Sequence, residues 1–170
     1  MPADTADDIL TSSVNIRGRF DKDGSVTTSM QFKNPMMETR LLVSIVDDDE
    51  SVRESLPDLL HEFGFDVQTF SSAEEFLGSE NVLQTDCMIV DMKMPGMSGQ
   101  ELQLELRRRC VVFPLIFITA HQDEAVRLGV LAEGAIECLF KPFSDTALLA
   151  ALETVLRANS KLNGRLTIRS

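Results

Sequence analysis

An alternation of strand-length apolar runs with helix-patterned segments constrains the fold of this chain most strongly. The apolar runs lie at 41–46, 66–70, 87–91, 114–119 and 137–140. Apolar residues recur at helical spacing between and after them, at 50–63, 72–77, 98–109, 124–133 and 145–158. Strands that are apolar throughout are covered on both faces, so the pattern predicts a parallel sheet between two layers of helices.

Five such strand–helix units in about 120 residues favour one architecture, an α/β flavodoxin-like doubly wound fold. We therefore expect a five-stranded parallel sheet with strand order 2-1-3-4-5. In this architecture, ligands bind outside the carboxyl ends of the strands. The residues that end the strands are thus the first candidates for a functional site.

The alternation does not cover the whole chain, and it divides the sequence into three parts. Residues 39–160 form the predicted domain, 161–170 a short tail, and 1–38 a polar extension. Alternating apolar residues between 14 and 32 flank an Asp-Lys-Asp-Gly turn sequence, which is typical of a hairpin. Because an isolated hairpin is marginal in water, we expect the extension to be mostly disordered.

Charge and composition exclude several classes of partner. The net charge is −11, which argues against direct nucleic-acid binding, since that depends on basic groups. The sequence contains no apolar run of 18 residues, so it predicts no membrane span, and the N-terminus does not resemble a signal peptide. Three widely spaced cysteines, Cys87, Cys110 and Cys138, indicate buried free thiols in a reducing cytoplasm.

Polar side chains gather at the predicted carboxyl edge of the sheet. The first strand ends in Asp47, Asp48 and Asp49, the third in Asp91, the fourth in Thr119, and the fifth leads into Lys141. Each has an ordinary explanation alone: Asp49, for example, suits a helix N-cap. Together, crowded carboxylates repel by roughly 4 kcal/mol per pair at about 4 Å and an effective dielectric of 20. A divalent cation relieves that repulsion, and oxygen ligands of this kind favour Mg²⁺.

The region from about 41 to 158 resembles the receiver domain of bacterial response regulators. The resemblance rests on four segments with matching order and spacing: 45–49, 89–99, 117–120 and 134–143. The loop Met-Pro-Gly-Met-Ser-Gly at 94–99 and the Phe143 after Lys-Pro are most similar to regulators of the nitrogen-fixation type.

The resemblance implies a role for each matching residue. Asp91 would accept the phosphoryl group, Asp48 would bind Mg²⁺ directly, and Asp47 would bind it largely through water. The backbone carbonyl of Lys93 would complete the protein ligands. Thr119 would hydrogen-bond the phosphoryl group and move on activation. Lys141 would pair with that group and form a cis peptide bond with Pro142.

The implied partners are a histidine kinase or phosphotransfer protein as donor and a downstream protein as target. A homodimer through the face of the fourth helix, fifth strand and fifth helix is a further expectation. The resemblance departs from the family at Cys138, where receivers usually carry Tyr or Phe. Strand alternation places Phe140 on the same face, so we expect it to belong to an apolar contact surface there.

Two readings of the output stay open. The chain is either a stand-alone receiver or the receiver part of a DNA-binding transcription factor. We favour the first, because the 13 residues after Arg157 are too few for a DNA-binding domain. An enzyme is not expected: aspartyl-phosphate phosphatases of the haloacid-dehalogenase type need an Asp where Lys93 stands.

Overall fold

The computed structural model describes residues 19–20, 26–27 and 40–166, without the side chains of 19–20, 26–27 and 160–166. The chain divides into two units, 1–39 and 40–170. In the first unit, β1 (Arg19–Phe20) pairs antiparallel with β2 (Val26–Thr27). This short hairpin lies within the predicted region 14–32. The rest of the predicted extension lies outside the described residues.

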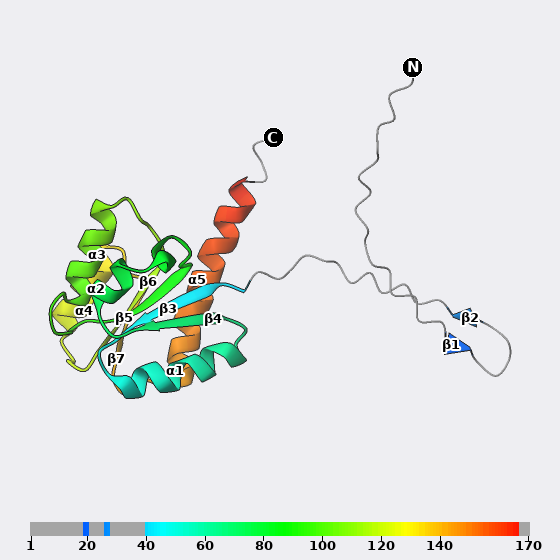
Figure 1. The fold of residues 1–170 in the computed structure, drawn as a ribbon, viewed down its shortest axis with the longest axis horizontal. Helices are drawn as coiled ribbons and strands as arrows, with labels where there is room; N and C mark the ends of the chain where they lie inside the picture. Colours follow the sequence, from blue (N-terminus) through cyan, green and yellow to red (C-terminus); the bar gives the residue numbers. More distant parts are fainter. Residues whose placement is uncertain (1–18, 21–25, 28–39, 167–170) are drawn as a thin grey trace, which may run out of the picture. The chain divides into compact units, whose positions relative to one another are not determined.

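The second unit contains the predicted parallel sheet (Figure 1). Its strands, in spatial order, are β4 (Asp66–Phe70), β3 (Leu42–Val46), β5 (Cys87–Asp91), β6 (Leu115–Thr119) and β7 (Glu137–Phe140). All four neighbouring pairs are parallel. Because β3 is the first strand of this unit, the order is the expected 2-1-3-4-5.

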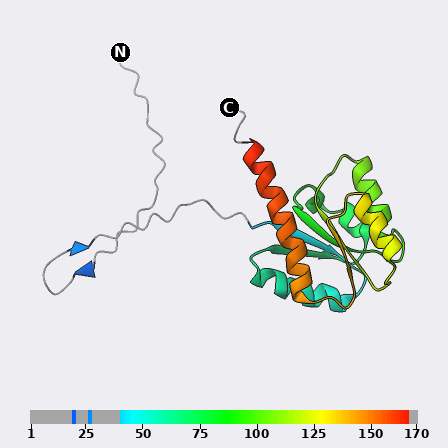
Figure 2. The ribbon, with the colours of Figure 1, turned by 180° about the vertical axis from the view of Figure 1, so that it is seen from behind.

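Helices cover both faces of the sheet (Figures 1 and 2). They are α1 (Glu50–Glu62), α2 (Ala73–Leu77), a 3₁₀ turn (Glu80–Leu83), α3 (Gly99–Arg108), α4 (Glu124–Ala132) and α5 (Asp145–Leu166). One face of the sheet packs with α2, α3 and α4, where Phe76, Leu102 and Val130 are buried. The other packs with α1 and α5, through Leu60 and Leu152 among others.

All five described α-helices begin at the carboxyl edge of the sheet with capping side chains. Each cap accepts a hydrogen bond from a backbone N–H of the helix that follows: Asp49, Ser72, Ser98, Asp123 and Ser144. Ser98 and Glu101 cap each other reciprocally, as in a capping box. These caps satisfy N–H groups that lack partners within the helix. They thereby fix the residue at which each loop of the site ends and the next helix begins.

Two expectations are corrected by the structure. The last helix continues to Leu166 instead of ending at 158. The apolar spacing marked only the stretch that packs on the sheet, and the sequence after it contains no proline to end the helix. Cys110 is exposed, since it lies in the turn after α3 with φ of 58°, whereas Cys87 and Cys138 are buried.

No helix in the described part of the chain is long and apolar enough to cross a membrane.

Candidate functional site

Four adjacent strand ends bring the predicted site residues together. Asp47 follows β3, Asp91 ends β5, Thr119 ends β6 and Lys141 follows β7. Backbone hydrogen bonds continue past the strands: Lys141 N–H donates to the Thr119 carbonyl at 2.8 Å. The parallel register thus places four residues that are far apart in sequence at one sheet edge.

Three carboxylates form the acidic cluster: Asp47, Asp48 and Asp91. One carboxylate oxygen of each lies within 4.8 Å of the others. Asp47 is fully buried and Asp91 is 7% exposed, whereas Asp48 is open to solvent. The cluster therefore combines an oxygen-only donor set with access from solvent.

Lys141 neutralises part of this charge. Its Nζ donates a hydrogen bond to Asp47 Oδ2 at 2.9 Å and lies 3.7 Å from Asp91 Oδ1. The other oxygen of Asp47, Oδ1, accepts from the Asp49 N–H at 2.9 Å. Both oxygens of Asp47 are thus engaged by the protein. The Lys141–Pro142 peptide bond is cis, as the resemblance implied.

The surroundings shift the pKa values of two of these groups. Burial raises the pKa of Asp91 to about 6; the charges of Asp47 and Asp48 add to the rise, and Lys141 opposes it. Burial by itself would lower the pKa of Lys141. The hydrogen bond and charge of Asp47, with further help from Asp91, outweigh that effect and raise the pKa. Lys141 is therefore a fixed cation beside a carboxylate that is costly to ionise without a further positive charge.

Thr119 and Lys93 line a cavity of about 260 Å³, together with Met92, the residue after Asp91. Thr119 is 3% exposed, and its Oγ1 accepts from the His121 N–H at 3.1 Å. Lys93 is exposed and follows Asp91 by two residues. The cavity gives the strand edge an opening bordered by a hydroxyl and a cationic side chain.

Asp49 has a separate role. Its side chain accepts from the Ser51 N–H at 2.9 Å and caps α1. Hydrogen bonds from Ser51 lower its pKa. The capping interpretation of Asp49 is confirmed, and the acidic cluster does not need it.

Two residues near the site were missed by sequence reasoning. Arg53 of α1 donates from Nη1 to the Asp47 carbonyl at 2.7 Å. Glu74 of α2 accepts from the Met97 N–H, in the loop after β5, at 2.8 Å. Neither contact has a local sequence signal, because each depends on how a helix packs beside a loop.

Cys138 stands in β7 where receivers usually carry Tyr or Phe, and Phe140 is the last residue of the same strand. Cys138 is 2% exposed and packs in the core with α2, α3 and α4. Phe140 is partly buried and pairs in register with Thr119. Phe140 is therefore the aromatic side chain of β7, next to the strand end that carries the hydroxyl.

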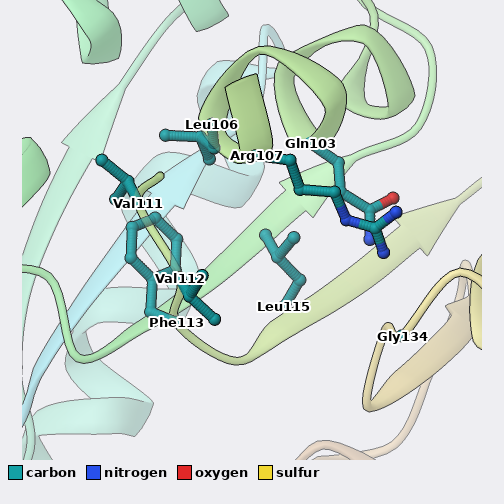
Figure 3. Close-up of a pocket in the computed structure, with 8 residues that line it drawn as sticks. All are labelled: Gln103, Leu106, Arg107, Val111, Val112, Phe113, Leu115 and Gly134. Carbon is teal, nitrogen blue, oxygen red and sulfur yellow. The ribbon is translucent and has the colours of Figure 1, made fainter. Parts of the chain in front are cut away.

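A second cavity, of about 110 Å³, lies between α3 and the start of β6 (Figure 3). Gln103 and Arg107 project toward it from α3, while Phe113 and Leu115 border it where β6 begins. It lies near the amino end of β6, opposite the edge that carries Thr119. None of the predicted site residues lines it.

Comparison with known proteins identifies the family. The family described as "Response regulator receiver domain" matches residues 43–153. Nodulation protein W of Bradyrhizobium diazoefficiens is 37% identical over 144 residues, covering 85% of this chain and 61% of that protein. The transcriptional regulatory protein FixJ of Azorhizobium caulinodans is 39% identical over 120 residues, covering 71% and 57%. This chain thus spans 57–61% of the length of these two relatives.

Comparison with solved structures supports the same family. The response regulator StyR superposes with a TM-score of 0.67 at 44% identity, covering 75% of this chain and 65% of that one. A receiver domain protein from Clostridium thermocellum has a TM-score of 0.66 at 29% identity, covering 72% and 98%. Together with the strand order and the residues at the sheet edge, these matches show that the chain belongs to the response regulator receiver domain family of two-component systems.

Proposed function

We propose that this protein is a two-component receiver that accepts a phosphoryl group on Asp91 in the presence of Mg²⁺. The observation that carries the proposal is the position of Asp91 at the centre of the site. Its carboxylate lies in the acidic cluster and 3.7 Å from Lys141 Nζ, and Thr119 ends the neighbouring strand of the sheet. A nucleophile, a cation and a hydroxyl thus lie at the same edge of the sheet.

The donor set fits Mg²⁺ as the metal. All candidate ligands are oxygens, namely Asp48, Asp91, Asp47 through water, and the Lys93 carbonyl, and Mg²⁺ prefers such ligands while keeping several waters. The engagement of both Asp47 oxygens by Lys141 and the Asp49 N–H supports the indirect role for Asp47. When bound, the ion supplies positive charge that neutralises the carboxylates and the incoming phosphoryl oxygens.

The transfer step follows from the residues present. A carboxylate oxygen of Asp91 attacks the phosphorus of a phosphohistidine on the donor protein. The P–O bond forms as the P–N bond breaks, and the leaving imidazole nitrogen keeps the bonding electrons and is protonated. Lys141 pairs with a phosphoryl oxygen, and the Thr119 hydroxyl donates to another. Hydrolysis of the aspartyl phosphate returns the carboxylate.

The phosphoryl donor is a histidine kinase or a phosphotransfer protein. The phosphorylated receiver then acts by binding a downstream protein in the cytoplasm. A second candidate is the receiver part of a longer DNA-binding regulator. It is favoured by one observation: this chain spans 61% or less of relatives that include transcriptional regulatory proteins. The reading frame after Ser170 in the gene distinguishes the two.

The test of the central proposal is the mass of the intact protein after incubation with acetyl phosphate and MgCl₂. We expect one added phosphate on the wild type and none on Asp91→Asn. Asp66→Asn is the matched control, because Asp66 is an exposed aspartate at the start of β4, and it should be labelled like the wild type. EDTA should abolish labelling. An unlabelled wild type at saturating donor and Mg²⁺ would refute the proposal.

A further inference from the structure

A carboxylate from α2 holds the loop that follows Asp91. Glu74 Oε1 accepts a hydrogen bond from the Met97 N–H at 2.8 Å, across 23 positions of sequence. Glu74 is exposed, so the contact is not a consequence of core packing. A side chain on one helix thereby reaches into the loop between β5 and α3.

The glycine before Met97 is adapted to the same oxygen. Gly96 has φ of +77°, a conformation that side chains rarely adopt. A Cβ added to Gly96 would lie 2.7 Å from Glu74 Oε1. A glycine at 96 therefore serves two requirements: the left-handed turn and the close approach of the Glu74 carboxylate.

The two ends of this loop have their own anchors. The Met92 N–H donates to the Ile118 carbonyl at 2.9 Å, and the Gly99 N–H donates to the Met92 carbonyl at 3.1 Å. The Ser98 N–H donates to Glu101 at 2.8 Å within the capping box. Between Lys93 and Met97, the bond to Glu74 is the one hydrogen bond to the loop backbone within the described residues. Glu74 thus holds the middle of the loop through this hydrogen bond.

We propose that Glu74 is a positioning residue for the metal site, which it orders through the backbone of the loop that carries Lys93. This inference rests on the proposed function, in which the Lys93 carbonyl is a Mg²⁺ ligand. Asp47, Asp48 and Asp91 come from strand ends or the residues directly after them, whereas Lys93 lies on a loop. A ligand on a loop binds only in the fraction of molecules in which the loop has the right conformation, so apparent affinity falls with that fraction.

Removal of the hydrogen bond between Glu74 and Met97 should therefore weaken metal binding. We expect Glu74→Ala to reduce Mg²⁺ affinity about 3- to 10-fold, at or below the roughly 10-fold lower bound for partners that orient a metal ligand directly, because Glu74 acts through the loop backbone. Glu74→Gln should retain most of the affinity, because its amide oxygen can accept the same hydrogen bond. This rescue separates the hydrogen bond from the simple loss of a negative charge near a cation.

Glu75 provides the matched control on the same helix. It is exposed and acidic like Glu74, but its carboxylate accepts from the N–H and hydroxyl of Ser71, at the start of α2. Glu75→Ala removes one charge and a contact local to that helix start, and should leave Mg²⁺ affinity within a factor of two of the wild type.

Gly96 provides a test of the contact itself. Gly96→Ala introduces the Cβ against Glu74 Oε1 and should weaken Mg²⁺ binding at least as much as Glu74→Ala does. In the Glu74→Ala background the opposing oxygen is gone, so the same substitution should cost less. Such non-additivity is expected of groups in direct contact.

The measurement is isothermal titration of each variant of the 170-residue chain with MgCl₂, after far-UV circular dichroism has shown that each is folded. A second readout needs no metal: amide hydrogen exchange at Met97 should be faster in Glu74→Ala than in the wild type or Glu75→Ala. Equal Mg²⁺ affinity of the wild type and Glu74→Ala would overturn this inference alone. Absence of Mg²⁺ binding by the wild type would overturn the metal site of the proposed function as well.

Discussion

The ammonium of Lys141 lies nearer to Asp47 than to Asp91, at 2.9 Å against 3.7 Å. Asp47 is fully buried, so Lys141 is the cation that compensates a charge which water cannot reach. In the proposed cycle the lysine would exchange part of this contact for a phosphoryl oxygen. Lys141 therefore has a structural task in the unphosphorylated protein as well as one in phosphoryl binding.

Lys141→Met should consequently destabilise the protein before any phosphorylation takes place. Loss of one partner of a buried ion pair costs several kcal/mol, and partial exposure of the lysine reduces this to about 1–3 kcal/mol. Urea unfolding followed by circular dichroism is a suitable measurement, because the chain has no tryptophan. Arg108→Met is the control: its pair with Glu105 is at the surface, and its loss should cost about 0–1 kcal/mol. If the two substitutions lowered the free energy of unfolding equally, the ion pair of Lys141 with Asp47 would not have the stabilising role inferred here.

Asp91→Asn should stabilise the metal-free protein at neutral pH. The pKa of Asp91 is about 6 in the folded state, above its ordinary value near 4, so ionisation of this group opposes folding. Its unfavourable effect is fully present above pH 6 and disappears as pH falls below about 4. The expected gain is roughly 1–3 kcal/mol at pH 7.5, and it should shrink at pH 5.

The check is urea unfolding of wild type and Asp91→Asn in EDTA at both pH values. Added Mg²⁺ should stabilise the wild type more than the variant, since a ligand that binds the folded state shifts the unfolding equilibrium. A gain that is independent of pH would show that Asp91 ionisation is not its source.

Gly99→Ala should destabilise the protein at the end of β5, the strand that carries Asp91. A Cβ at this position would lie 2.4 Å from the Asp91 carbonyl oxygen and 3.1 Å from the Phe117 ring. Backbone must move to make room, and such overpacking costs about 1–3 kcal/mol or more. Gly129→Ala in α4 is the control: its Cβ meets nothing within 4 Å, and alanine should stabilise the helix by about 0.5–1 kcal/mol. Opposite signs in thermal denaturation are expected, and a neutral Gly99→Ala would contradict the close approach.

Phe140→Asp should weaken self-association or binding of the downstream partner and leave labelling of Asp91 intact. Phe140 lies in β7, which contacts both α4 and α5, and Leu128 of α4 and Leu156 of α5 are 57% and 41% exposed. A charge in an apolar contact surface is costly to desolvate. Leu83→Asp is the control, because Leu83 is 84% exposed on the 3₁₀ turn between α2 and β5. Sedimentation velocity of the phosphorylated protein measures the association. If both variants associate and bind the partner like the wild type, Phe140 has no part in the readout.

Most of the fold was predictable because the sheet is buried on both faces. That arrangement requires strands that are apolar throughout, and those runs stand out between helical patterns. The end of α5 was not predictable in this way, since apolar spacing reports packing and not helical hydrogen bonding. Cys110 was expected in the core for a related reason: its neighbours are apolar, but it lies in the turn after α3 with positive φ and is exposed.

The sequence by itself determined the parallel sheet, its strand order and the candidates at its carboxyl edge, because period and strand-end chemistry are local properties of the chain. Tertiary structure decided which of these groups touch. It placed Lys141 nearer to Asp47 than to Asp91, and it brought Glu74 to the loop after Asp91. Such contacts depend on the packing of helices beside loops, at distances of a few ångströms that no periodic pattern along the chain encodes.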